Sequence, residues 1–113
     1  KFHSVMTRDI ARTETRTVAD RSSRYFYNPM WSLFGDRSPG PPGTYFYRKS
    51  SAEEYFWHMY DQVLLRPGVM NTLRDLSILE SDGESSLLTP GNRPDKRTAS
   101  DHLPLLFRLD LDT

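Results

Sequence analysis

The sequence contains no cysteine, which excludes a disulfide framework and any cysteine-ligated zinc or iron–sulfur site. It has no apolar run that approaches the ~20 residues of a membrane-spanning helix. Its first residues, 1–5, also lack the long apolar segment of a secretory signal. With these features missing, a cytoplasmic location is the default expectation.

An excess of charge of either sign is also absent, because 15 Lys and Arg balance 15 Asp and Glu. Proteins dedicated to nucleic acid usually carry a basic excess that neutralises phosphates, so the composition does not favour tight binding to long duplex DNA. An enzyme acting on phosphate esters is still compatible with it, since a bound divalent cation can supply positive charge locally. With 113 residues, 36% hydrophobic and 27% charged, the chain fits one small domain or a piece of a larger one.

The pattern of side chains divides the chain into a polar lead-in, 1–23, and a β-rich part, 24–111. The lead-in is expected to hold a short helical turn within 5–11 and then an exposed loop over 13–23, which has no sustained apolar face. Apolar and aromatic runs predict strands in the β-rich part, with the last one half-buried because apolar and polar residues alternate. These strands are expected at 24–27, 44–47, 73–80 and 105–111.

The segment 50–66 has two interpretations. Ser51 followed by Glu54 resembles a helix capping box. From Trp57 onward, however, bulky residues occupy both alternating sets of positions, as in a strand that is covered on both sides. We therefore favour a turn at 50–54 and a strand that runs to Arg66, where Pro67 ends it.

Three other stretches carry no strand signal. Residues 30–34 are apolar but too short to assign to helix or strand, and 35–43, with three prolines and three glycines, are predicted to form a loop. A second loop is predicted over 81–99. A loop of that length is uncommon in a compact domain unless it has a task.

Candidate chemistry is concentrated at Asp61, Asp101 and His102. The motif Ser-Asp-His-Leu-Pro at 100–104 marks the point where the second loop enters the closing strand, and side chains at such a point are exposed yet held by a rigid scaffold. Taken alone, this motif is also typical of an ordinary polar loop end. A second motif, Asp-Gln-Val-Leu-Leu at 61–65, lies a few dozen residues upstream.

In this order and context, the two motifs resemble the closing part of the endonuclease/exonuclease/phosphatase superfamily. That superfamily includes deoxyribonuclease-like nucleases, abasic-site endonucleases, sphingomyelinases and inositol-phosphate phosphatases. The resemblance covers residues 25–111 and implies an α+β fold. The chain would form half of a four-layer α/β/β/α sandwich, contributing one mainly antiparallel sheet with few helices.

The resemblance also implies a role for each candidate residue. His102 would contact the scissile phosphate and stabilise its charge or assist proton transfer, and Asp61 would accept a hydrogen bond from the other ring nitrogen and thereby orient the ring. Asp101 would help to hold Mg²⁺ or Mn²⁺, which polarises the phosphoryl group. The implied activity is that of a divalent-metal-dependent phosphodiesterase or nuclease-like hydrolase. Its partner is a phosphate-ester substrate, with nucleic acid among the options.

Several family features have no counterpart here: an amino-terminal Asn, a metal-binding Glu, a mid-chain Tyr or His, and a Gly-Asp-Phe-Asn-like segment. We therefore expect a carboxyl-terminal fragment that is inactive alone, with its open apolar face covered by the missing amino-terminal half or by self-association. The alternative is a non-catalytic β-rich binding or interaction module in which the Asp-His pair is incidental. Hydrogen-bond reach between Asp61 and His102 distinguishes the two.

The remaining candidates have plainer interpretations. His3 and His58 lack ligand partners at useful spacing and are expected to be surface or packing residues, while Trp31 and Trp57 are expected to pack in the core rather than stack on bases. A basic cluster ahead of the closing motif would either contact substrate phosphates or form a solvated loop. Its members are Arg93, Lys96 and Arg97.

Overall fold

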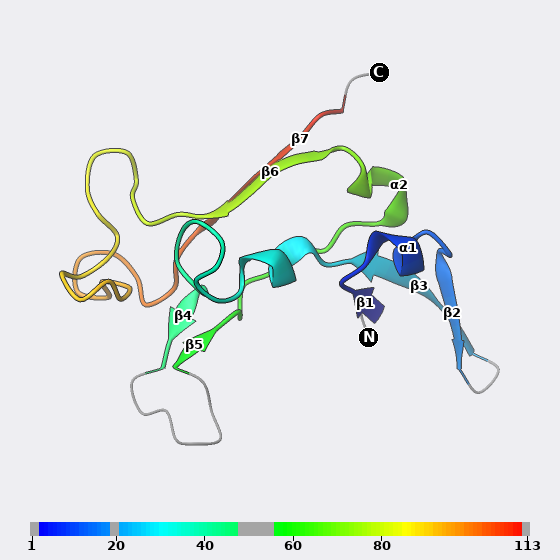
Figure 1. Ribbon diagram of the computed structural model, residues 1–113, viewed down its shortest axis with the longest axis horizontal. Helices are drawn as coiled ribbons and strands as arrows, with labels where there is room; N and C mark the ends of the chain where they lie inside the picture. The colour runs from blue at the N-terminus through cyan, green and yellow to red at the C-terminus, as the bar shows by residue number, and fades with distance from the viewer. Residues whose placement is uncertain (1–2, 19–20, 48–55, 112–113) are drawn as a thin grey trace.

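The computed structural model describes residues 3–18, 21–47 and 56–111. Within them the chain forms short strands in small sheets with few helices, a mixed and β-rich arrangement (Figure 1). The elements are β1 (His3–Val5), α1 (Arg8–Ala11), β2 (Thr15–Val18), β3 (Arg21–Tyr27), η1 (Pro29–Leu33), β4 (Tyr45–Phe46), β5 (Trp57–His58), α2 (Pro67–Met70), β6 (Leu73–Ile78) and β7 (Leu105–Leu109). None of the helical elements in this described part has the length and apolarity to cross a membrane.

The first sheet has the order β1-β3-β2, with β3 parallel to β1 and antiparallel to β2. The exposed loop predicted over 13–23 is therefore wrong, because β2 and β3 form a hairpin there. Thr15, Thr17 and Val18 are β-branched and favour extended backbone even without an apolar face. The proposed boundary between the lead-in and the β-rich part falls inside β3. The helical turn predicted within 5–11 is confirmed as α1, whose Ala11 is fully buried.

The apolar stretch left open between helix and strand is the 3-10 helix η1. Asn28 begins it by accepting a hydrogen bond at Oδ1 from the Met30 amide, at 3.0 Å, and Pro29 follows at the first helical position, where a missing N–H costs nothing. One side of this short helix carries the buried Met30. Trp31 lies on another side and is 48% exposed, so the expected core position of Trp31 is wrong.

The second sheet pairs β4 with β5, with Tyr45 opposite His58 and Phe46 opposite Trp57. The strand predicted at 44–47 is confirmed at its centre, and the turn predicted at 50–54 lies outside the described residues. The strand predicted from Trp57 to Arg66 ends at His58. Beyond that point the described segment forms no continuous ladder: the Gln62 side chain donates to the Met59 carbonyl at 2.8 Å, and Leu65 forms an isolated bridge with Tyr27.

The third sheet pairs β6 with β7 in antiparallel register, from Leu73 opposite Leu109 to Ile78 opposite Leu105. Both strands were predicted from their apolar runs, and the loop predicted over 81–99 connects them. The half-buried pattern of the closing strand is only partly present, since Phe107 is 44% exposed. Three small sheets thus occur in the described residues, where one sheet was expected, and one of them contains a parallel pair.

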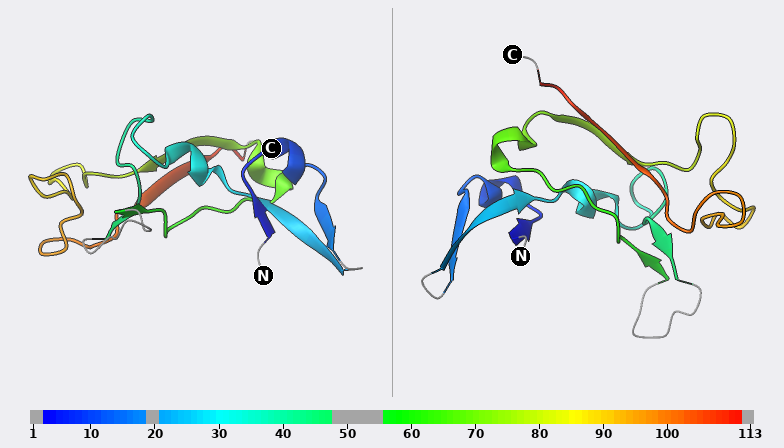
Figure 2. Two further views of the ribbon diagram at one scale, coloured as in Figure 1. Left: turned by 60° about the horizontal axis from the view of Figure 1, so that its bottom comes forward. Right: turned by 180° about the vertical axis from the view of Figure 1, so that it is seen from behind.

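The core is small and is built from all parts of the described chain. Leu65 brings the segment after β5 into contact with the first sheet, because its amide and carbonyl both bond to Tyr27. The β2–β3 hairpin and the 81–99 loop lie at opposite ends of the molecule (Figure 2). The buried apolar residues are Ala11, Met30, Met59, Val63, Leu65, Met70, Ile78 and Leu103.

Candidate functional site

Asp61 and His102 lie side by side although 41 residues separate them in the sequence. The Nδ1 atom of His102 is 2.6 Å from Oδ2 of Asp61, and each side chain is 41% exposed. An ionised carboxylate can only accept hydrogen bonds, so opposite an ionised Asp61 the Nδ1 atom carries a hydrogen and donates a hydrogen bond to Oδ2. The imidazole is thereby held through Nδ1, and Nε2 is the ring nitrogen that does not contact Asp61.

A fully buried residue, Thr44, ties the segments that carry this pair together. Its Oγ1 accepts a hydrogen bond from the Asp61 amide at 3.1 Å, and its carbonyl accepts one from the Leu103 amide at 2.8 Å. Its own amide donates to the His58 carbonyl at 2.9 Å. One residue just before β4 therefore sets the positions of the Asp61 loop, of β5 and of the backbone next to His102.

Close packing at this point also explains the glycine before Thr44. A Cβ atom on Gly43 would lie 2.8 Å from the His58 carbonyl oxygen, which is closer than real Cβ contacts. Gly43 therefore lets the two backbones approach closely enough for β4 and β5 to pair. A larger residue would push β5 away from Thr44.

His102 is anchored on its other sides as well. It forms an isolated antiparallel bridge with Tyr45, and its amide donates to Oγ of Ser100 at 3.1 Å. The ring packs near the ring of Tyr45, with centroids 5.0 Å apart, and Leu103 next to it is buried. These contacts restrict the ring and the backbone together, so the imidazole is oriented before any ligand arrives.

The turn that leads into the closing motif is held by Asp95. The hydroxyl of Thr98 donates to its Oδ2 at 2.8 Å, and this bond is the main cause that lowers the pKa of Asp95 below the ordinary value of 3.8. The Arg97 amide donates to Oδ1 at 3.2 Å and lowers the pKa further. An ionised Asp95 therefore stabilises the turn that presents Asp101 and His102.

Asp101 is exposed and lies on the wall of a surface pocket beside His102. Mg²⁺ prefers octahedral oxygen ligands and is usually held by one or two carboxylates with water and substrate oxygens. In the described residues no group of three or more His, Asp or Glu side chains could hold a metal ion. The described side chains therefore do not form a metal site by themselves.

The other residues that the sequence singled out have structural positions outside the Asp61–His102 site. His58 packs among aromatic rings, 4.8 Å from the ring of Tyr60, which is the packing role expected of it. His3 is opposite Tyr25 in the first sheet. Trp57 packs against the core. The basic cluster divides, because Arg93 and Lys96 line the pocket that contains Asp101, and Arg97 is not part of its described lining.

Thr44 and Tyr45 are the site residues that sequence reasoning missed. Their run was recognised as a strand, but nothing in the run indicates that it would meet both Asp61 and His102. The only local signal is Gly43, since a glycine that enters a strand often marks a close approach of another backbone.

Comparison of the chain with protein-family models, with curated proteins and with solved structures finds no match.

Proposed function

We propose that this chain is the carboxyl-terminal part of a divalent-metal-dependent phosphodiesterase of the endonuclease/exonuclease/phosphatase type. The observation that carries the proposal is the 2.6 Å hydrogen bond between Asp61 and His102. The resemblance requires this contact, and the alternative of an incidental Asp-His pair does not. Two positions so far apart in the chain have no local reason to meet.

The energetics of the pair favour a positioning role over a stabilising one. Pairs this exposed typically contribute about 0–1 kcal/mol to folding, because water screens them and the side chains lose freedom. The Asp61–His102 pair is nonetheless supported by a buried threonine and by an adjacent buried leucine. Support of this kind suits a ring whose orientation matters for chemistry.

The role of His102 in the proposed reaction depends on which of its ring nitrogens is hydrogen-bonded to Asp61. With Nδ1–H bonded to the carboxylate, Nε2 of His102 faces a phosphate ester as the free ring nitrogen. In the protonated ring Nε2–H donates to a phosphate oxygen and stabilises its charge, and in the neutral ring Nε2 accepts a proton. Asp61 keeps the ring in one tautomer and acts through His102, so it is a positioning residue.

The proposed parent fold is the four-layer sandwich that the resemblance implies, with this chain as one half. It is supported by apolar side chains that remain in water near the end of the chain: Leu106 is 58% exposed and Phe107 is 44% exposed. These neighbours point to opposite faces of β7, and a two-stranded ribbon such as β6–β7 is marginal by itself. A second half of the domain would cover one of these two faces.

In this proposal Asp101 would be one oxygen ligand of Mg²⁺ or Mn²⁺, and the further ligands would come from outside this chain. When bound, the ion supplies positive charge to the phosphoryl oxygens. The isolated chain is then inactive.

The test is a phosphodiesterase assay with Mg²⁺ or Mn²⁺ on the full-length protein that contains this chain, with the isolated chain alongside. The substrates are bis-p-nitrophenyl phosphate and a single-stranded oligonucleotide. His102→Ala should lower kcat by about 100-fold or more, the usual contribution of a general acid or base. Arg108→Ala, which removes an exposed partner of Asp75, is the matched control and should leave kcat unchanged.

Activity that survives His102→Ala would remove this histidine from the proposed mechanism. A full-length protein without activity on either substrate, and with partner binding unaffected by His102→Ala, would support the alternative of a binding module.

A further inference from the structure

A pocket of ≈ 380 Å³ opens beside the Asp61–His102 pair. One wall is the aromatic run of β4 and the residue after it, Tyr45, Phe46 and Tyr47, and the loop residues Arg93 and Lys96 form another. Tyr45 is shared with the proposed site, because its ring lies 5.0 Å from the ring of His102. A group held in this pocket would therefore be a neighbour of a group held at His102.

The pocket carries more positive than negative charge among its described lining residues, since Arg93 and Lys96 face a single carboxylate, Asp101. Arg93 does not extend freely into water. Its guanidinium carbon lies over the ring of Phe46, 4.3 Å from the centroid, an attractive cation–π geometry that keeps the planar group in place. A positioned guanidinium has less freedom to lose when it binds an anion.

The loop that carries these cations is also anchored on both sides. The Arg93 carbonyl accepts from the Thr89 amide at 2.7 Å, and the Asp95 amide donates to the Leu87 carbonyl at 2.9 Å. Pro94 between them is buried and forms a bridge with Leu88. Because its backbone is fixed in this way, the segment that carries Arg93 and Lys96 forms a stable wall of the pocket and is not a freely solvated loop.

We propose that this pocket is a subsite for a second phosphate group of the substrate, next to the phosphate that His102 contacts. The proposal rests on the proposed function and adds the substrate class: a molecule with at least two phosphates on neighbouring positions. Arg93 and Lys96 supply the charge-assisted hydrogen bonds, and the β4 aromatic wall contacts the group that joins the phosphates. An oligonucleotide and a polyphosphorylated small molecule share this chemistry.

The test measures binding to the full-length protein by calorimetry, with EDTA present so that nothing is hydrolysed. Thymidine 3′,5′-bisphosphate is compared with thymidine 5′-monophosphate, and the bisphosphate should bind about tenfold more tightly, the effect of one charge-assisted hydrogen bond. Arg93→Gln and Lys96→Gln should each remove most of this advantage. Arg97→Gln is the matched control, because it removes the same charge from the same loop outside the described pocket lining.

Equal binding of the two nucleotides, or equal losses in Arg93→Gln and Arg97→Gln, would overturn the subsite. His102→Ala separates this failure from failure of the proposed function. If His102→Ala weakens both nucleotides while Arg93→Gln has no selective effect, the proposed function stands and the subsite is rejected. If Arg93→Gln is selective and His102→Ala changes nothing, the pocket binds phosphate without the proposed site, and the inference as stated is rejected as well.

The same variants distinguish the two sources of the second phosphate. A short oligothymidylate and inositol 1,4,5-trisphosphate are titrated into the wild-type protein and into Arg93→Gln. The ligand that loses about tenfold in affinity on this substitution, with no loss in Arg97→Gln, identifies the class. Loss with neither ligand counts against the subsite.

Discussion

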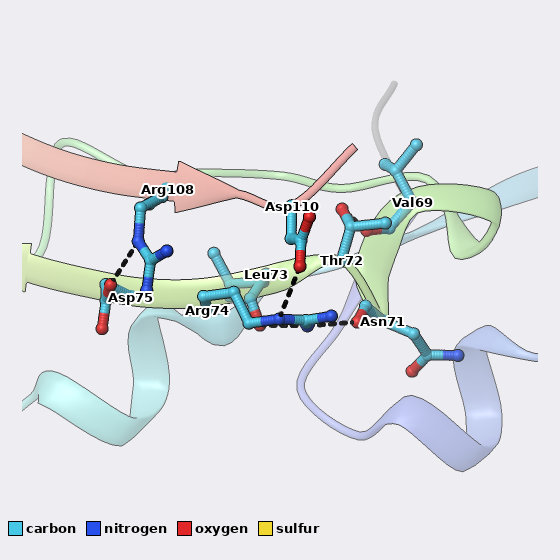
Figure 3. A network of polar contacts seen from close by, with 8 residues as sticks. All are labelled: Val69, Asn71, Thr72, Leu73, Arg74, Asp75, Arg108 and Asp110. Carbon is cyan, nitrogen blue, oxygen red and sulfur yellow. Dashed lines mark hydrogen bonds and ion pairs between the residues drawn. The ribbon is translucent and has the colours of Figure 1, made fainter. Parts of the chain in front are cut away.

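Two regions of the molecule contain a carboxylate bonded to a nitrogen-rich side chain at almost the same distance. Asp61 lies 2.6 Å from His102, and Asp75 lies 2.7 Å from the Nε of Arg108. The second pair belongs to a row of contacts along β6 and β7, where Arg74 also approaches Asp110 at 3.6 Å (Figure 3). A short distance therefore does not by itself mark a functional pair.

The surroundings of the two pairs are what differ. The Asp75 and Arg108 side chains are both 66% exposed and join strands that the backbone ladder already pairs. The Asp61–His102 pair is 41% exposed and joins two distant segments that Thr44 also links by hydrogen bonds. Cross-strand pairs of the first kind contribute a few tenths of a kcal/mol to roughly 1 kcal/mol. In the proposed mechanism the second kind positions a reactive group, so its loss should affect activity more than stability.

The largest expected effect compares the two carboxylates by the same isosteric change. Asp61→Asn should lower kcat of the full-length protein about 10- to 100-fold, because an amide can donate to Nδ1 and favour the other tautomer of His102. Asp75→Asn should change kcat by less than about twofold, as expected for a surface substitution away from the site. Steady-state assays on the two variants test this prediction. Similar losses of kcat in both variants would show that the two pairs do not differ in function.

The next effect concerns Thr44. Thr44→Val keeps the shape but leaves the Asp61 amide without its acceptor, which should cost about 1–3 kcal/mol of unfolding free energy in a buried site. The ¹⁵N shifts of the His102 ring should also change, because the Asp61 carboxylate moves away from Nδ1. Urea unfolding followed by tryptophan fluorescence gives the first quantity and NMR the second.

Thr44→Ser is the matched variant, since it restores the hydroxyl and should restore the ring shifts even if some stability is lost with the methyl group. A merely structural role for Thr44 would leave the His102 shifts of folded Thr44→Val like those of the wild type.

The smallest effect is a pH dependence in the turn before the closing motif. Because the pKa of Asp95 is lowered in the folded chain, its ionised form stabilises the turn above the ordinary pKa of 3.8. This contribution is lost as the pH falls through the lowered value. Carboxyl ¹³C titration should place the Asp95 midpoint below 3.8, and Thr98→Val should raise it, since the Thr98 hydroxyl is the main cause. An unchanged midpoint in Thr98→Val would assign the shift to the backbone.

The part of the fold that follows from short-range pattern could be predicted. The apolar runs at β6 and β7 and the polar 81–99 loop between them are found where the sequence places them. The candidate pair was reached by resemblance, and the structure brings Asp61 and His102 into contact as that resemblance requires. The longest predicted strand ends at His58, because the described segment after it bonds singly to Thr44 and to Tyr27 and finds no one strand to pair with.

The sequence by itself determined where backbone tends to extend and where it turns, since β-branching, proline and glycine act within a few residues. Only the tertiary structure decided that Thr15–Val18 pairs with β3 and that Trp31 faces water. It also decided that Thr44 joins Asp61 to the backbone of His102, and that Arg93 enters the pocket wall while Arg97 does not. These outcomes depend on which distant segments pack together in the core. That packing is set by how much apolar surface whole elements bury against one another, and a local sequence pattern does not contain this information.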